Sequence, residues 1–115
     1  MAILPKRRHS NSRRQDVGRR FPGHCAWVRG HACSVTGCLA RDIECAHVRR
    51  GTDGGAGVKP SDWWTVSLCA GHHAEQHDIG EVAFEERHGI DLKALARTFA
   101  MRSHHRFCWQ DGSRR

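Results

Sequence analysis

Residues 68–77, LCAGHHAEQH, hold one cysteine and three histidines within ten positions. Thiolate sulfur and imidazole nitrogen are the ligands that zinc prefers, and four of them complete a tetrahedral site. Cys69 and His72 form a C-x2-H pair, and Cys33 and Cys38 form a C-x4-C pair upstream. Two such pairs, brought together by the fold, predict a structural zinc site that stabilises a chain with a small core. The alternative is four buried side chains without an ion.

His73 and His77 are left over, and their i, i+4 spacing places both imidazoles on one face of a helix, within reach of one ion. Adjacent helical residues point about 100° apart, so His72 and His73 can face different ions. The spacing therefore predicts a second, catalytic metal site beside the structural one. The alternative is that His73 or His77 supplies the fourth zinc ligand and the others lie at the surface.

His47, in the segment ECAHVRRG, is the candidate general base. It ends a strand expected over residues 43–48, and an antiparallel return over 63–68 would set it beside the histidine-rich helix. A neutral imidazole that faces a metal-bound phosphate can take a proton from the attacking water. This geometry predicts phosphodiester hydrolysis. The alternative is a packed, hydrogen-bonded strand histidine.

The elements expected around these residues mix short strands and helices. A helical turn is predicted within 21–28, a glycine-rich loop between the two strands, and a helix from residue 69 to about 78. A helix over 81–88 should stop at Gly89, and Asp91 should cap a further helix with an apolar stripe. The predicted fold class is α+β, in a single domain.

The two segments CSVTGCLARDIECAHVRRGTDGGAGVKPSD and WWTVSLCAGHHAEQHDIG carry a specific order of motifs. In that order and spacing, residues 33–80 resemble the HNH, or ββα-metal, endonuclease superfamily, and most of all its small phage- and prophage-encoded members, including Ref-like recombination-enhancement nucleases. The resemblance implies a small zinc-stabilised ββα-metal core with additional C-terminal helices. It also implies an enzyme that hydrolyses DNA.

Positions carried over from the resemblance make His47 the general base and give His73 and His77 a catalytic Mg²⁺ or Mn²⁺. The zinc knuckles of the superfamily match Cys33, Cys38, Cys69 and His72, although C-x2-C is usual there.

Two departures from the pattern matter. Ala46 stands where many relatives have a third metal ligand, which leaves water, the phosphate, or a carboxylate such as Glu44 or Asp62 to complete the ion's shell. The middle Asn of the motif falls near Trp64, and Asp62 is the nearest residue able to orient His47. A plain turn residue after Pro60 is the alternative role for Asp62.

Positive charge predicts a nucleic-acid partner. The net charge is +7, and residues 1–20 hold seven Lys and Arg residues against one Asp. This segment is predicted to be a disordered basic arm that binds phosphates. Arg49, Arg50 and Lys59 flank the glycine-rich loop and could contact DNA phosphates. The resemblance leaves open a recombinase–DNA filament as a further partner, and the oligomeric state is not determined.

The predicted division is an arm over 1–20, a nuclease-like domain over 21–101 and a tail over 102–115. The apolar run near the N-terminus is too short for a signal peptide and no segment could span a membrane, so a cytoplasmic location with reduced thiols is expected. Cys25, Cys45 and Cys108 are interpreted as buried or incidental thiols. Two rival functions remain: a non-catalytic zinc-binding nucleic-acid-binding module, and an adaptor whose arm binds an acidic protein.

Overall fold

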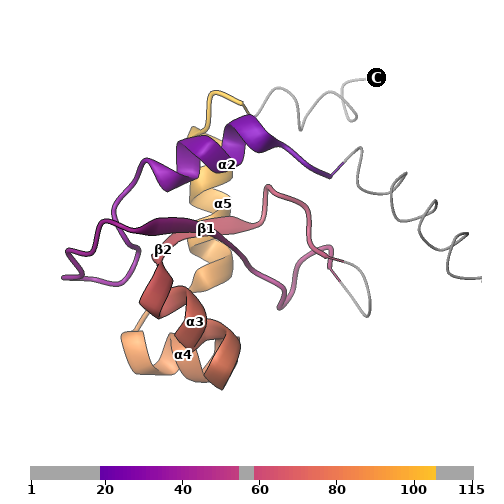
Figure 1. Ribbon diagram of the computed structural model, residues 1–115. Coiled ribbons are helices and arrows are strands. Elements are labelled where there is room, and N and C mark those ends of the chain that lie inside the picture. The colour runs from indigo at the N-terminus through magenta and orange to yellow at the C-terminus, as the bar shows by residue number, and fades with distance from the viewer. Residues whose placement is uncertain (1–18, 55–58, 106–115) are drawn as a thin grey trace, which may run out of the picture.

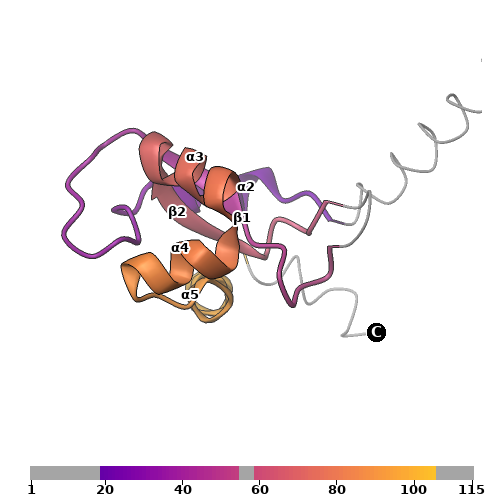
Figure 2. The ribbon, with the colours of Figure 1, turned by 90° about the horizontal axis from the view of Figure 1, so that it is seen from below.

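A two-stranded antiparallel sheet lies between helices in the computed structural model, which describes residues 19–54 and 59–105 (Figure 1). Helices α2 and α5 lie on opposite sides of the strands (Figure 2). In chain order the elements are α2 (Pro22–Arg29), β1 (Ile43–His47), β2 (Thr65–Cys69), α3 (Ala70–Ile79), α4 (Glu81–His88) and α5 (Leu92–Arg102). The predicted α+β class is confirmed, and each predicted helix and strand is present to within two residues.

The hairpin of β1 and β2 places residues 43–47 beside residues 65–69. In its register Ile43 pairs with Cys69 and His47 pairs with Thr65, so the second strand runs back along the first. All five residues of β2 are buried, and the core contains Ala46, Leu68 and Phe84. Because β2 leads directly into α3, the histidines of that helix start at the end of the sheet.

Local signals at helix ends explain where the helices stop and start. Gly89 ends α4 with φ 65°, a left-handed conformation that glycine adopts without steric cost. The Asp91 carboxylate accepts a hydrogen bond from the Ala94 N–H and caps α5. Cys69 caps α3, since its sulfur accepts the His72 N–H at 3.4 Å.

At each end of the predicted domain, 21–101, residues beyond its boundary also pack or form ion pairs. Arg19 and Arg20, predicted to belong to the arm, bind Asp53 and Asp62 at 3.3 and 2.7 Å. Their partners lie 34 and 42 residues away in sequence. The pattern of charges along the chain therefore predicted that both arginines are solvated. At the other end Ser103 is buried. The rest of the predicted arm and most of the predicted tail lie outside the described residues.

A membrane-spanning helix is absent from residues 19–54 and 59–105, where no helix is both long and apolar enough to cross a bilayer. The cytoplasmic location stays a prediction.

His24 on α2 is a buried histidine that makes the fold sensitive to acid. Its Nδ1 lies 2.9 Å from Ser103 Oγ, and its ring centroid lies 4.3 Å from that of Trp63. Burial and the nearby His105 lower the pKa of His24 to about 4. Between pH 6.5 and pH 4, His24 is therefore protonated in the unfolded chain but neutral in the folded chain. The free energy of unfolding falls as the pH is lowered through this range.

Between pH 7 and pH 5 we expect the wild-type protein to lose about 2 kcal/mol of unfolding free energy through His24 alone. Urea unfolding at pH 7 and at pH 5, with zinc present in both, measures this difference in unfolding free energy. The His24→Gln variant is the control because it lacks this titration, and an equal pH dependence in both proteins would contradict the assignment.

Candidate functional site

The four predicted zinc ligands come together at one point of the structure. One ligand atom from each of Cys33, Cys38, Cys69 and His72 lies within 4.8 Å of all the others. His72 Nδ1 lies 3.2 Å from Cys69 Sγ and 3.4 Å from Cys33 Sγ. Three sulfurs and one imidazole nitrogen match the donor set of structural zinc sites, so this cluster could hold a metal ion.

The cluster joins two segments that are distant in sequence, residues 33–38 and residues 69–72. Gly37, with φ 83°, permits the tight turn between the first two cysteines. Cys69 ends β2, and its N–H donates to Cys33 Sγ at 3.4 Å. A metal ion here would pin the turn before β1 to the first turn of α3.

A second group touches the same histidine from the other direction and was not predicted from sequence. Ligand atoms of His72, Glu75 and His88 all lie within 4.8 Å of one another. The Glu75 carboxylate accepts hydrogen bonds from His88 at 2.9 Å and Arg87 at 2.5 Å. The His88 bond, followed by the Arg87 bond, lowers the pKa of Glu75. A carboxylate beside a metal-binding imidazole commonly fixes the ring orientation, which is the role that Glu75 can fill for His72.

His47 is hydrogen-bonded to Asp62, the residue predicted to orient it. His47 Nε2 lies 2.8 Å from Asp62 Oδ1, and the other oxygen of this buried carboxylate accepts the Phe21 N–H at 2.7 Å. Burial alone would raise the pKa of Asp62. The hydrogen bonds from His47 and Phe21 and the charge of Arg20 outweigh burial and hold that pKa well below its usual range. A charged Asp62 accepts the proton of Nε2–H, which leaves Nδ1 as the basic nitrogen.

Both oxygens of Asp62 accept hydrogen bonds from N–H groups, Oδ1 from His47 and Arg20 and Oδ2 from Phe21. These contacts favour the orienting role of Asp62 over that of a metal ligand. Arg20, predicted to belong to the basic arm, donates to Asp62 Oδ1, and its Nη1 lies 3.3 Å from His47 Nε2.

His73 and His77 form the second histidine pair on α3. Their Nε2 atoms lie 3.3 Å apart. Two ligands about 2.0–2.1 Å from one ion in tetrahedral geometry are separated by about this distance, so the pair could hold an ion with little movement. His73 Nδ1 lies 2.7 Å from Glu44 Oε1. Glu44, considered from sequence as a third ligand, thus engages the far side of the ring and favours the tautomer with Nε2 free for metal.

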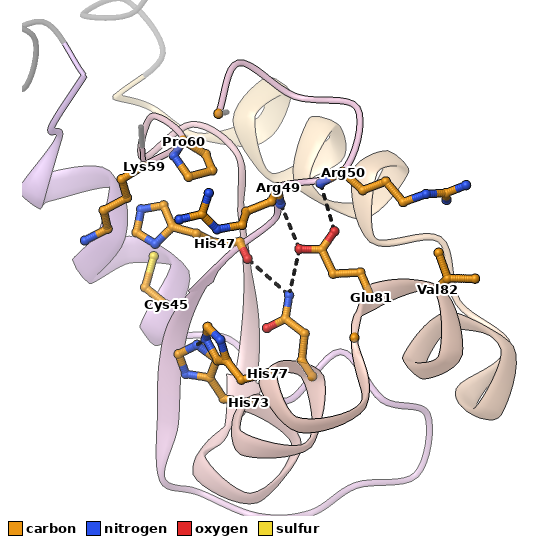
Figure 3. Close-up of a pocket in the computed structure, with 13 residues that line it drawn as sticks. Cys45, His47, Arg49, Arg50, Lys59, Pro60, His73, His77, Glu81 and Val82 are labelled. Atoms are coloured by element: carbon orange, nitrogen blue, oxygen red, sulfur yellow. Dashed lines mark hydrogen bonds between the residues drawn. The ribbon is translucent and has the colours of Figure 1, made fainter. Parts of the chain in front are cut away.

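His47 and the His73–His77 pair line the same open hollow, of about 970 Å³. In Figure 3 the side chain of Cys45 lies between the ring of His47 and the rings of His73 and His77. The three cationic residues predicted to contact nucleic acid, Arg49, Arg50 and Lys59, line this hollow as well. The sequence-predicted site residues are therefore gathered at two places: the Cys/His cluster, and the hollow with Asp62 behind His47.

A polar clamp fixes the end of β1 against the helices. The Glu81 carboxylate accepts the backbone N–H groups of Arg49 and Arg50 at 2.8 and 2.9 Å. The buried Gln76 side chain donates to His47 O at 3.1 Å. Sequence reasoning missed both clamp residues because their partners lie about 30 residues away and no local pattern marks them.

Cys25 and Cys45, interpreted from sequence as buried or incidental, are half-buried free thiols. A hydrogen bond between them raises the pKa of Cys25 and lowers that of Cys45. Cys45 also lines the hollow, so it is not incidental to the site's shape. Cys108 lies outside the described residues.

A family model and a bacterial relative match this chain. The model of a family described as "Protein of unknown function (DUF968)" matches residues 13–105. An uncharacterized protein of Escherichia coli strain K12, YdfU, is 35% identical over 71 residues. That match covers 62% of this chain and only 20% of the relative. No solved structure matches.

Proposed function

The chain belongs to the DUF968 family, and from the geometry of its site we propose that it is a metal-dependent endonuclease of the HNH type that hydrolyses DNA phosphodiester bonds. One observation carries the proposal: an Asp-oriented histidine and a second histidine pair at ligand spacing line the same cation-rimmed hollow. Neither feature alone points to hydrolysis, but together they supply a base and a place for an ion.

His47 acts as the general base in this proposal. Its Nδ1 takes a proton from the attacking water as the new bond to phosphorus forms and the bond to the leaving oxygen breaks. Asp62 stabilises the imidazolium through Nε2–H, and Arg49 and Lys59 hold the phosphate that is cut. A Mg²⁺ or Mn²⁺ ion bound by His73 and His77 would polarise the phosphate and stabilise the leaving oxygen.

The Cys/His cluster has a structural role in the proposal. Zinc bound there keeps the first turn of α3 in place, and with it the histidine pair that follows. The HNH resemblance, a phage or prophage origin and a recombinase–DNA filament as partner are part of the same proposal and rest on the sequence motifs.

A non-catalytic zinc module that binds nucleic acid is the second candidate, and one observation favours it. Ala46 offers no ligand, Glu44 is hydrogen-bonded to the far side of His73, and within the described residues no third Cys, His, Asp or Glu completes a metal-binding group with His73 and His77. A site with two protein ligands binds metal weakly, as expected for a domain whose catalysis has been lost.

Cleavage of supercoiled plasmid by the zinc-loaded chain separates the two candidates. We expect nicked or linear DNA when Mn²⁺ or Mg²⁺ is added, no cleavage without added ion, and no cleavage by a His73→Ala, His77→Ala double variant. His31→Ala, which removes an exposed histidine from the loop after α2, is the matched control. Tight DNA binding without cleavage in any of these ions would favour the zinc module.

A further inference from the structure

Trp64 carries two cations over its ring at the edge of the site. The Lys93 Nζ and Arg97 Cζ atoms lie 5.9 and 6.0 Å from the ring centroid. Lys93 and Arg97 are one turn apart on α5, so both reach the ring from the same helix. A cation held against an aromatic face keeps its charge and loses side-chain freedom before any ligand arrives.

Two carboxylates that line a hollow together with Lys93, those of Glu85 and Asp91, have other partners. Glu85 accepts the Leu92 N–H at 2.7 Å, and Asp91 accepts the Ala94 N–H at 3.0 Å. Within residues 19–54 and 59–105, neither Lys93 nor Arg97 forms an ion pair. The two cations are therefore available to an anionic partner.

Arg50 connects this pair of cations to the hollow that contains His47. It lines that hollow and also a neighbouring one, whose wall includes Gly51 and Lys93. A Cβ atom on Gly51 would lie 3.3 Å from Lys93 Nζ, so loop and helix are in close contact there. Figure 3 shows the side chains of Arg49 and Arg50 pointing in opposite directions, Arg49 towards His47 and Arg50 away from it.

We propose that Lys93 and Arg97, held by Trp64, extend the DNA-binding surface beyond Arg50 and contact backbone phosphates of duplex DNA away from the scissile bond. The inference rests on the proposed function for its partner. A duplex is favoured over a single strand because single-strand binding uses open aromatic faces for base stacking, whereas this ring is half-buried and has cations over it.

Salt dependence of binding tests the proposal. Fluorescence anisotropy of a labelled duplex is measured against salt concentration with the full zinc-loaded chain. Every sample carries His47→Ala and no added Mg²⁺ or Mn²⁺, which prevents cleavage. Each phosphate contact contributes about 0.9 to the slope of log K against log salt. Lys93→Gln with Arg97→Gln should therefore reduce the magnitude of the slope by about 2 and weaken binding roughly tenfold at moderate salt.

The control is Arg29→Gln with Arg41→Gln, which removes the same charge from exposed positions on other segments. A reduced slope for Lys93→Gln with Arg97→Gln, together with a control slope that stays near that of the parent, supports the proposal. Equal reductions in both double variants, or no reduction in either, would overturn it while the DNA-binding role stands. Absence of duplex binding by the parent would remove both the proposed function and this inference.

Discussion

The His47→Ala variant should cut DNA about 10²–10⁴-fold more slowly than the wild-type protein, the range expected when a general base is removed. The loss follows from geometry: His47 Nε2 is committed to Asp62 at 2.8 Å, and among the described residues its Nδ1 has no hydrogen-bond partner. Initial rates of plasmid nicking at saturating Mn²⁺ measure the effect. The variant should retain its zinc, since the Cys/His cluster contains none of the atoms removed.

Two further results make this prediction specific. Added imidazole should restore part of the activity of His47→Ala, because the substitution leaves room for a soluble base. Asp62→Asn should also slow cleavage, since a neutral amide cannot stabilise the imidazolium that forms. Equal rates for the wild-type protein and His47→Ala would remove His47 from the mechanism even if DNA is still cut.

Loss of the structural ion should have the largest effect on stability. Zinc-binding free energies of small zinc domains are about 10–16 kcal/mol, which equals or exceeds the whole unfolding free energy of a typical domain. We therefore expect Cys38→Ser to abolish cooperative thermal unfolding, and the wild-type chain to contain one tightly bound zinc. Circular dichroism and a colorimetric zinc assay measure both.

Cys25→Ser is the matched control for this prediction. Cys25 is a half-buried thiol like Cys38, but it pairs with Cys45 and lies outside the cluster. It should leave the zinc content unchanged. A Cys38→Ser protein that keeps both its zinc and its melting temperature would show that the cluster is not a structural metal site.

Local sequence signals were enough to predict the elements and the ligand set. The left-handed glycine at 89 and the capping Asp91 fix helix boundaries within one turn, so neighbouring residues contain the information. The Cys/His cluster was predictable because a turn and a helix start each supply a close pair, and one tetrahedral metal site needs two pairs.

Contacts between distant polar residues were not predictable in the same way. Arg20 reaches Asp62, and Glu44 reaches His73, across 42 and 29 residues. No periodic sequence pattern marks either pair, and from sequence Arg20 was predicted to belong to a solvated basic segment. Only the closure of the hairpin shows that Asp62 faces a histidine and an arginine together, and that Glu44 lies behind an imidazole.

Several residues of the candidate site lie at the start of α3 and along it, and this limits which changes in its sequence the site can tolerate. Residues 69–77 contain two members of the Cys/His cluster, the histidine pair at 73 and 77, and the Gln76 amide that donates to the end of β1. Each inserted residue rotates everything after it by about 100° around the helix axis. A one-residue insertion or deletion anywhere between His72 and His77 therefore breaks the angular phase between these groups, whereas point substitutions at exposed positions such as Ala74 preserve it.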